Sequence, residues 1–169
     1  MNNKKRMMFV LDEDYYFITI KIISILKYMN CIKNKIVDYR KIAYIIAFIS
    51  DENNFKLFSK SINDFNTLSI IEREKLISIY CKGNIDQPIV KRVLFFLEKR
   101  NIVCMNKNNK YGCIDLSLVK NNDLDVLFED WVFEEDMERI KSFYSKYSRV
   151  KSVKYDTFMN KVFGSSEVY

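Results

Sequence analysis

The fold is decided by the stretch from Lys91 to Asp115, KRVLFFLEKRNIVCMNKNNKYGCID. Its first part has apolar residues at the spacing of a buried helix face, and its second part has the pattern of two short strands around a polar turn. An Asn-Asn pair at 108 and 109 suits a tight two-residue turn, which places Lys107 opposite Lys110. Two facing lysines would be costly in an interior, so we expect the tip of this hairpin to lie in water.

The residues before this stretch predict a helix, a turn and a second helix. Ser69 and Glu72 have the spacing of a capping box, which starts a helix over 70–81. Gly83 suits a left-handed stop at the end of that helix, and Pro88 is tolerated in the first turn of the next one. Helix, turn, helix and hairpin follow one another in the order of a winged helix-turn-helix.

Two apolar helices come earlier in the chain. In 14–32, apolar residues recur at alternating spacings of four and three, and a similar face is found in 37–49. The short polar turn between them, KNK, predicts an antiparallel pair. A third, shorter helix follows, with Ser50 or Asp51 as its cap.

The composition favours helices over sheets. Three Gly and one Pro among 169 residues leave few turns, and 49% hydrophobic residues are enough for a core. We therefore expect a mostly α chain with a small β-hairpin, which the sequence divides into three regions. These regions are an N-terminal helical pair (1–66), a winged helix-turn-helix core (67–120) and C-terminal charged helices (121–169), which together form one compact unit.

Charge separates sharply after the hairpin. Residues 121–138 hold eight Asp or Glu and no Lys or Arg, whereas residues 139–161 hold seven Lys or Arg and one Asp. Either these helices pair with each other on the surface, or they form a bipolar docking arm for two partners. In the second alternative, the partner-binding side chains are Phe128, Trp131, Phe133, Tyr144, Tyr147, Arg149 and Lys151.

The net charge of +6 and a pI of about 9.0 are compatible with a nucleic-acid partner or an acidic protein partner. The start of the chain lacks the long apolar run of a secretory signal. Its apolar stretches are shorter than the roughly 18–20 residues that a membrane span needs. We therefore expect a cytoplasmic protein with no membrane contact.

The sequence offers little for catalysis. It has no His, and its four cysteines form no Cys-x-x-Cys pair. We therefore expect these cysteines to be small core residues, and we expect no metal site. In the register above, Cys104 faces Cys113. No phosphate loop, dinucleotide-binding turn or nucleophile elbow is present. The acidic run EDWVFEED could suggest Mg²⁺, but carboxylates on a helical face are more often solvated, so we expect no enzyme activity and no cofactor.

The arrangement as a whole resembles a known family. The segments that carry the resemblance are YYFITIKIISILKYM, VDYRKIAYIIAFIS, PIVKRVLFFLEKRNIVC, YGCIDL and VLFEDWV. They are similar to the middle-component proteins of bacterial three-component ABC systems, the group that includes the Lamassu-type defence operons. The resemblance does not extend to the basic end of the chain, SFYSKYSRVKSVKYDTFMNKVFG.

This resemblance implies an adaptor that links an SMC-like ATPase to an effector, often a nuclease, in an anti-phage or anti-plasmid complex. It leaves open whether the chain also makes a weak, nonspecific contact with DNA. The alternative function is a stand-alone winged-helix transcriptional regulator. A third hypothesis, a small nuclease or toxin, is supported only by the acidic run. In either DNA-contacting reading, the candidate residues are Gln87, Lys91, Arg92, Lys107 and Lys110.

Overall fold

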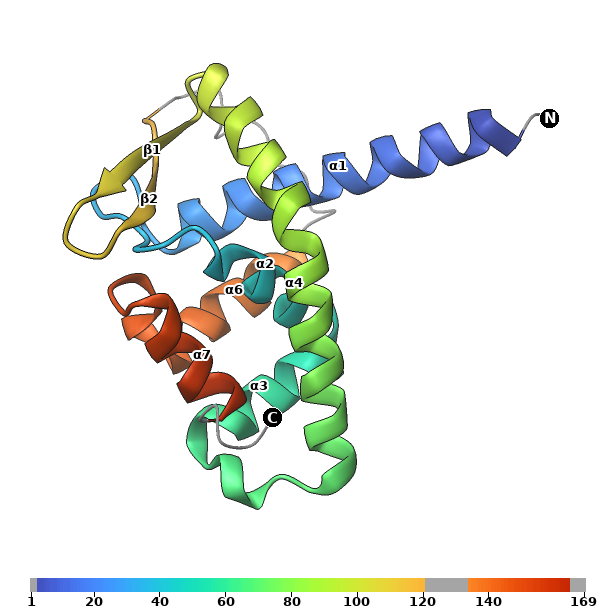
Figure 1. Ribbon diagram of the computed structural model, residues 1–169, viewed down its shortest axis with the longest axis vertical. Coiled ribbons are helices and arrows are strands. Elements are labelled where there is room, and N and C mark those ends of the chain that lie inside the picture. Colours follow the sequence, from blue (N-terminus) through green and yellow to red (C-terminus); the bar gives the residue numbers. More distant parts are fainter. Residues whose placement is uncertain (1–2, 121–133, 165–169) are drawn as a thin grey trace.

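The computed structural model describes the backbone of residues 3–120 and 134–164, and the side chains of 15–120 and 135–164. The described chain is mostly helical, with one two-stranded antiparallel hairpin (Figure 1). Its α-helices are α1 (Asn3–Tyr28), α2 (Lys41–Ile49), α3 (Glu52–Asn63), α4 (Ile70–Lys99), α6 (Glu134–Lys146) and α7 (Tyr155–Phe163). Its strands are β1 (Val103–Asn108) and β2 (Cys113–Leu118), and its short 3₁₀ turns are η1 (Phe65–Thr67) and η3 (Ser148–Lys151).

The long helix α4 runs along one side of the molecule, with α2, α3, α6 and α7 beside it (Figure 1). The hairpin lies near the C-terminal end of α4, and the N-terminal half of α1 extends away from the other helices. None of the described helices combines the length and the apolarity that crossing a bilayer would require.

The first helices lie close to where the sequence predicts them, with two changes at their starts. α1 begins before the predicted 14–32, and α2 begins at Lys41, four residues after the predicted start. The delay has a local cause, because Asp38 has a φ of 66° and its side chain accepts a hydrogen bond from the Arg40 amide at 3.1 Å. Asp51 is the cap of α3, since its side chain accepts from the Asn54 amide at 3.0 Å.

The predicted helix end after Cys81 is wrong, because α4 is one unbroken helix of 30 residues that continues past this point to Lys99. The capping box at its start is confirmed: the Ser69 hydroxyl accepts from the Glu72 amide, and the Glu72 carboxylate accepts from the Ser69 amide. Gly83 is buried inside the helix, where a Cβ would lie 2.4 Å from the Tyr44 ring. Gly83 thus serves a close approach of α2 to α4, and Pro88 lies within the helix rather than at a new start.

The hairpin is confirmed, but its predicted register is wrong. Asn108 pairs with Cys113, so the loop has four residues (109–112) instead of two. The Asn108 carbonyl accepts from the Gly112 amide at 2.8 Å, and Gly112 takes a φ of +64°, which glycine adopts at little cost. In consequence Lys107 faces Ile114, and Cys104 faces Ser117.

β2 also pairs with the segment that connects α1 to α2. Ile36 forms a bridge with Leu116, and the Tyr39 amide donates to the Ile114 carbonyl at 2.9 Å. At the far end of β2, the Leu118 amide donates to the Cys31 carbonyl at 2.9 Å. These bonds hold residues 31–39 against the hairpin.

The C-terminal helices belong to the main core. Phe143 of α6 stacks on Phe58 of α3 with ring centroids 4.1 Å apart, and both side chains are fully buried. Phe163 of α7 lies 5.6 Å from the Tyr44 ring and 5.7 Å from the Phe48 ring. From residue 134 onward, the described chain therefore lines the core, which differs from an arm that reaches out to partners.

Candidate functional site

Two buried carboxylates join the hairpin to the segment before α2. Asp115 in β2 is 1% exposed, accepts from Asn108 Nδ2 at 2.8 Å and pairs with Lys35 Nζ at 2.6 Å. Asp38 is 2% exposed and pairs with the Arg40 guanidinium at 2.6 Å. Because buried carboxylates need such partners, this network fixes the positions of Lys35 and Arg40.

A buried lysine holds η3 in place. Lys41 is fully buried, and its Nζ donates to the Val150 carbonyl at 2.5 Å and to the Val153 carbonyl at 2.7 Å. Burial lowers the pKa of this ammonium to about 8, although the nearby Asp38 and Asp115 carboxylates oppose that shift. The carbonyl contacts keep the chain after α6 close to the start of α2.

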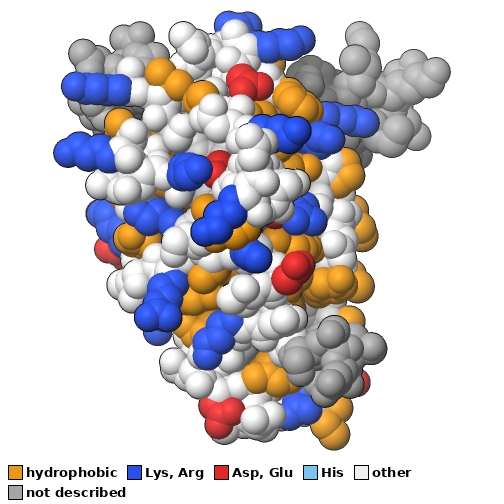
Figure 2. Space-filling view, turned by 60° about the vertical axis from the view of Figure 1, so that its left-hand side comes forward, with side chains coloured by type: hydrophobic (Ala, Val, Ile, Leu, Met, Phe, Trp, Pro, Cys, Tyr) orange, Lys and Arg blue, Asp and Glu red, His pale blue; other side chains and the backbone are white. Residues whose placement is uncertain are grey.

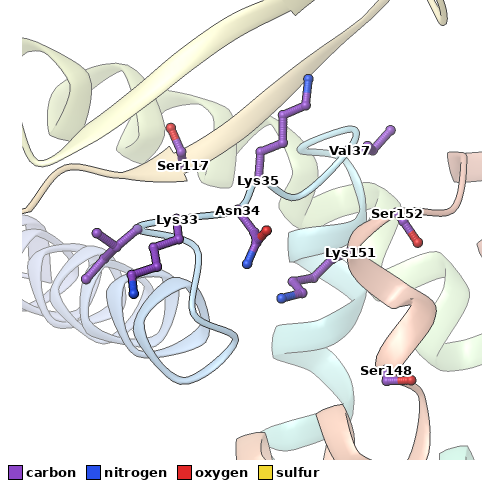
Figure 3. Close-up of a pocket in the computed structure, with 9 residues that line it drawn as sticks. Lys33, Asn34, Lys35, Val37, Ser117, Ser148, Lys151 and Ser152 are labelled. Atoms are coloured by element: carbon purple, nitrogen blue, oxygen red, sulfur yellow. The ribbon is translucent and has the colours of Figure 1, made fainter.

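Between these fixed segments lies a cavity of about 640 Å³, which we call the basic cleft. Asn34 lies between Lys33 and Lys151 in the view of Figure 3, whereas Lys35 points away from them. The orientation of Lys35 agrees with its ion pair to Asp115. The residues that line the cleft are Ile32, Lys33, Asn34, Lys35, Val37, Ser117, Ser148, Lys151 and Ser152.

Lys151 is held in place by a backbone carbonyl and an aromatic ring. Its Nζ donates to the Met29 carbonyl at 2.8 Å and lies 4.8 Å from the centroid of the Tyr144 ring. A carbonyl and an aromatic face attract a cation but do not neutralise it. Lys33 is exposed, and within the described residues no carboxylate forms a salt bridge with Lys33 or Lys151.

More cations lie along the same side of the molecule. Lys110 and Lys154 flank the exposed Tyr111 ring at the hairpin tip, with their Nζ atoms 5.2 Å and 4.7 Å from its centroid. Arg40 stacks over Tyr155 at 4.2 Å. Figure 2 shows Lys and Arg side chains spread over this face, with few Asp and Glu side chains among them.

The predicted DNA-binding residues do not form one surface. Gln87 is half-buried, and its Nε2 donates to the Tyr44 hydroxyl at 3.2 Å. Lys91 and Arg92 are exposed on α4, whereas Lys107 and Lys110 are exposed at the hairpin. No helix begins near Gln87, so the reading of that residue as the start of a recognition helix is corrected.

Four of the predicted partner-binding residues lie together around the C-terminal end of α6 and η3, where Lys151 contacts the Tyr144 ring. Tyr144 and Tyr147 are half-buried against the core, and burial raises the pKa of Tyr147. Arg149 is exposed on η3, and Lys151 lines the basic cleft. Phe128, Trp131 and Phe133 lie outside the described residues.

A second cleft lies between α1 and α4, and we call it the aromatic cleft. Its volume is about 320 Å³, and Tyr16 and Phe96 on its rim are 60% and 53% exposed. It is lined by Tyr15, Tyr16, Thr19, Arg92, Val93 and Phe96. Further exposed apolar side chains are spread over the outward-facing half of α4, and we call them the apolar row: Ile70, Ile71, Ile77, Tyr80, Ile85, Phe95 and Phe96.

Sequence reasoning missed most of both clefts. It treated KNK at 33–35 only as a polar turn between two helices, although two lysines and an amide in one exposed turn are a signal for anion binding. The sequence predicted two helices in place of α4, so the apolar side chains could not be assigned to the surface of one helix. Neither cleft has the chemistry of a metal site, and the described residues contain no cluster of three or more His, Cys, Asp or Glu that could hold one.

Comparisons with known protein families, with curated proteins and with solved structures found no match to this chain.

Proposed function

We propose that the chain is a non-catalytic adaptor that links an SMC-like ATPase to an effector in a defence complex, with an auxiliary contact to DNA. The observation that carries the proposal is the aromatic cleft, together with the exposed apolar row of α4. Large apolar side chains gathered on one face of a soluble domain mark a protein-binding surface.

Three residues of the row share the geometry of a helix-binding surface. Ile70, Ile77 and Phe95 are separated by 7 and 18 residues, or about two and five helical turns, so they project from the same side of α4. A second amphipathic helix could lie along such a line and insert side chains at intervals of three and four residues. The aromatic cleft would take the largest of these side chains.

The surrounding charges favour an acidic partner. Near the C-terminal end of α4, Lys91 lies 5.8 Å from the Phe95 ring, and Arg100 lies 5.1 Å from the Phe96 ring. Arg92 lines the cleft itself. We therefore propose as the occupant an amphipathic helix with Asp or Glu beside its apolar stripe, as a segment of the ATPase coiled coil.

We also propose that residues 31–118 form a variant of the winged-helix fold. The support is the pairing of β2 with both β1 and Ile36, which resembles a three-stranded winged-helix sheet. A stand-alone regulator is less well supported, because Gln87 is engaged with Tyr44 and offers little to a base edge.

Co-purification of this chain with the products of its neighbouring genes tests the adaptor proposal, which expects an SMC-like ATPase among them. We expect Phe96→Asp to weaken the complex by about thirtyfold or more, because a charge would enter a central apolar contact. Tyr111→Asp is the matched control, since it puts the same charge on an exposed ring at the hairpin tip. Circular dichroism should show both variants folded.

Two results would reject the proposal. One is a complex that retains its stability with Phe96→Asp. The other is a homodimer of the isolated chain, measured by light scattering, that Phe96→Asp dissociates, because the row would then be occupied by a second copy.

A further inference from the structure

We infer that the basic cleft is a binding site for the phosphate groups of double-stranded DNA. The inference rests on the auxiliary DNA contact proposed above, but it assigns that contact to the turn after α1 and to η3. It involves neither the middle of α4 nor the α1/α4 face.

The first support is fixed positive charge. Lys151 is oriented by the Met29 carbonyl and the Tyr144 ring, so little side-chain entropy remains to be lost when an anion binds. Lys33 lies opposite it across Asn34 (Figure 3) and has no carboxylate partner among the described residues. An incoming phosphate would meet both charges without first displacing an ion pair.

The second support is the set of neutral donors. The hydroxyls of Ser117, Ser148 and Ser152 and the amide of Asn34 line the same cavity, and none of the described Asp or Glu residues lines it. Lysine, serine and asparagine are the side chains that commonly bind backbone phosphates of DNA. The lysines beside these groups would repel a metal cation.

The lining also distinguishes a DNA backbone from a free nucleotide. At about 640 Å³ the cleft could admit a nucleotide, but the apolar residues that line it in the described part of the chain are Ile32 and Val37. Within the part of the chain that the structure describes, no aromatic ring lines the cleft, so a base would find no described ring on which to stack. The cleft therefore suits a phosphodiester backbone whose bases remain stacked within a duplex.

The basic face extends the site beyond one phosphate. Lys35 and Arg40 are fixed by Asp115 and Asp38 between the cleft and the hairpin, and Lys110 and Lys154 follow at the tip. Figure 2 shows that this side of the molecule is predominantly basic. A duplex backbone could follow these charges from the cleft toward the hairpin.

Fluorescence anisotropy with a short labelled duplex of random sequence tests the inference on the full chain. We expect Lys33→Glu to raise Kd about tenfold and to lower the slope of log K against log salt by about one. Lys33→Glu combined with Lys151→Gln should weaken binding further. Lys75→Glu, an exposed lysine near the start of α4, makes the same change in net charge and should alter Kd less than about twofold.

Three competitors identify the source of the phosphate. We expect inorganic phosphate and ATP to displace the duplex only at concentrations at which their ionic strength explains the effect, and single-stranded DNA to bind more weakly than the duplex. ATP binding that Lys33→Glu abolishes would show a nucleotide site instead. Tighter binding of single strands would reject the duplex.

The inference is wrong if the wild-type chain binds no duplex at low salt, or if Lys33→Glu and Lys75→Glu weaken binding equally. These failures are separable from failure of the adaptor proposal. Lys33→Glu should leave co-purification with the ATPase unchanged, and Phe96→Asp should leave duplex binding unchanged.

Discussion

Lys41 shows how a single residue connects distant parts of the chain. Its ammonium is fully buried and donates to the carbonyls of Val150 and Val153, more than a hundred residues later. A buried ammonium is tolerable only with such partners, because removal from water penalises the charge. Lys41 therefore ties η3, and with it the basic cleft, to the start of α2.

The lowered pKa of Lys41 makes stability depend on pH. Between about pH 8 and the ordinary lysine value of 10.5, the unfolded chain keeps a proton that the folded chain has released. Raising the pH through this window therefore favours the folded state, and below the window this group adds no pH dependence. We expect the free energy of unfolding of the wild-type chain, measured by urea denaturation, to rise across this pH window. The Lys41→Met variant should lack this rise.

Lys41→Met should also be less stable at neutral pH, by about 1–3 kcal/mol, since two buried carbonyls lose their donor. Exposed lysines have little effect, so Lys75→Met serves as the control. An identical pH profile for wild type and Lys41→Met would show that Lys41 does not titrate in this range.

Among the elements, α4 differs most from its prediction. Gly83 and Pro88 are residues that locally favour a break in a helix, but both lie within one helix of 30 residues. The Tyr44 ring packs on the Gly83 backbone, and its hydroxyl donates to Asn84 Oδ1 at 2.6 Å. Packing of α2 on α4 thus outweighs the local preference for a turn.

Gly83→Ala should therefore destabilise the protein by about 1–3 kcal/mol, because the new methyl group would overlap the Tyr44 ring. In an ordinary helix interior the same change stabilises by about 0.5–1 kcal/mol, so the sign of the effect is diagnostic. Ser78→Ala, at an exposed position of α4, should be close to neutral. Thermal and urea denaturation measure both, and a stabilised Gly83→Ala would contradict the close approach.

The hairpin illustrates a different limit of sequence reasoning. The alternating strand pattern predicts that the hairpin exists, but the pairing register depends on the length of the loop. Asn108-Asn109 suits a two-residue loop, whereas Gly112 suits a longer loop that ends at this glycine. The structure takes the longer loop because Gly112 can adopt a positive φ. Asp115 therefore faces Asn106, whereas the shorter loop would have placed it opposite Ile102, and its carboxylate binds Lys35.

For the whole molecule, one core joins all three regions that the sequence suggested. Residues from α1 to α7 contribute buried side chains to the same cluster. The stacked pair of Phe58 and Phe143 links α3 to α6 within it. Two surfaces remain outside this core: the α1/α4 face with its apolar row, and the basic face with its cleft.

Phe143→Ala should lower the free energy of unfolding by about 3–5 kcal/mol, because a fully buried ring is lost and a cavity remains. Phe95→Ala, an exposed ring on α4, should cost less than about 1 kcal/mol. Urea denaturation followed by circular dichroism measures both changes. Equal small losses would mean that α6 does not belong to the core.

The sequence by itself determined the helical class, the hairpin, the capping box at Ser69 and the exposed hairpin tip, because these depend on local periodicity and on residue types. Only the tertiary structure decided the continuity of α4, the hairpin register and the two clefts. The reason is that these features depend on contacts between residues far apart in the chain. Tyr44 packs on Gly83, and Lys33 and Lys151 line the same cleft, only after the core has formed.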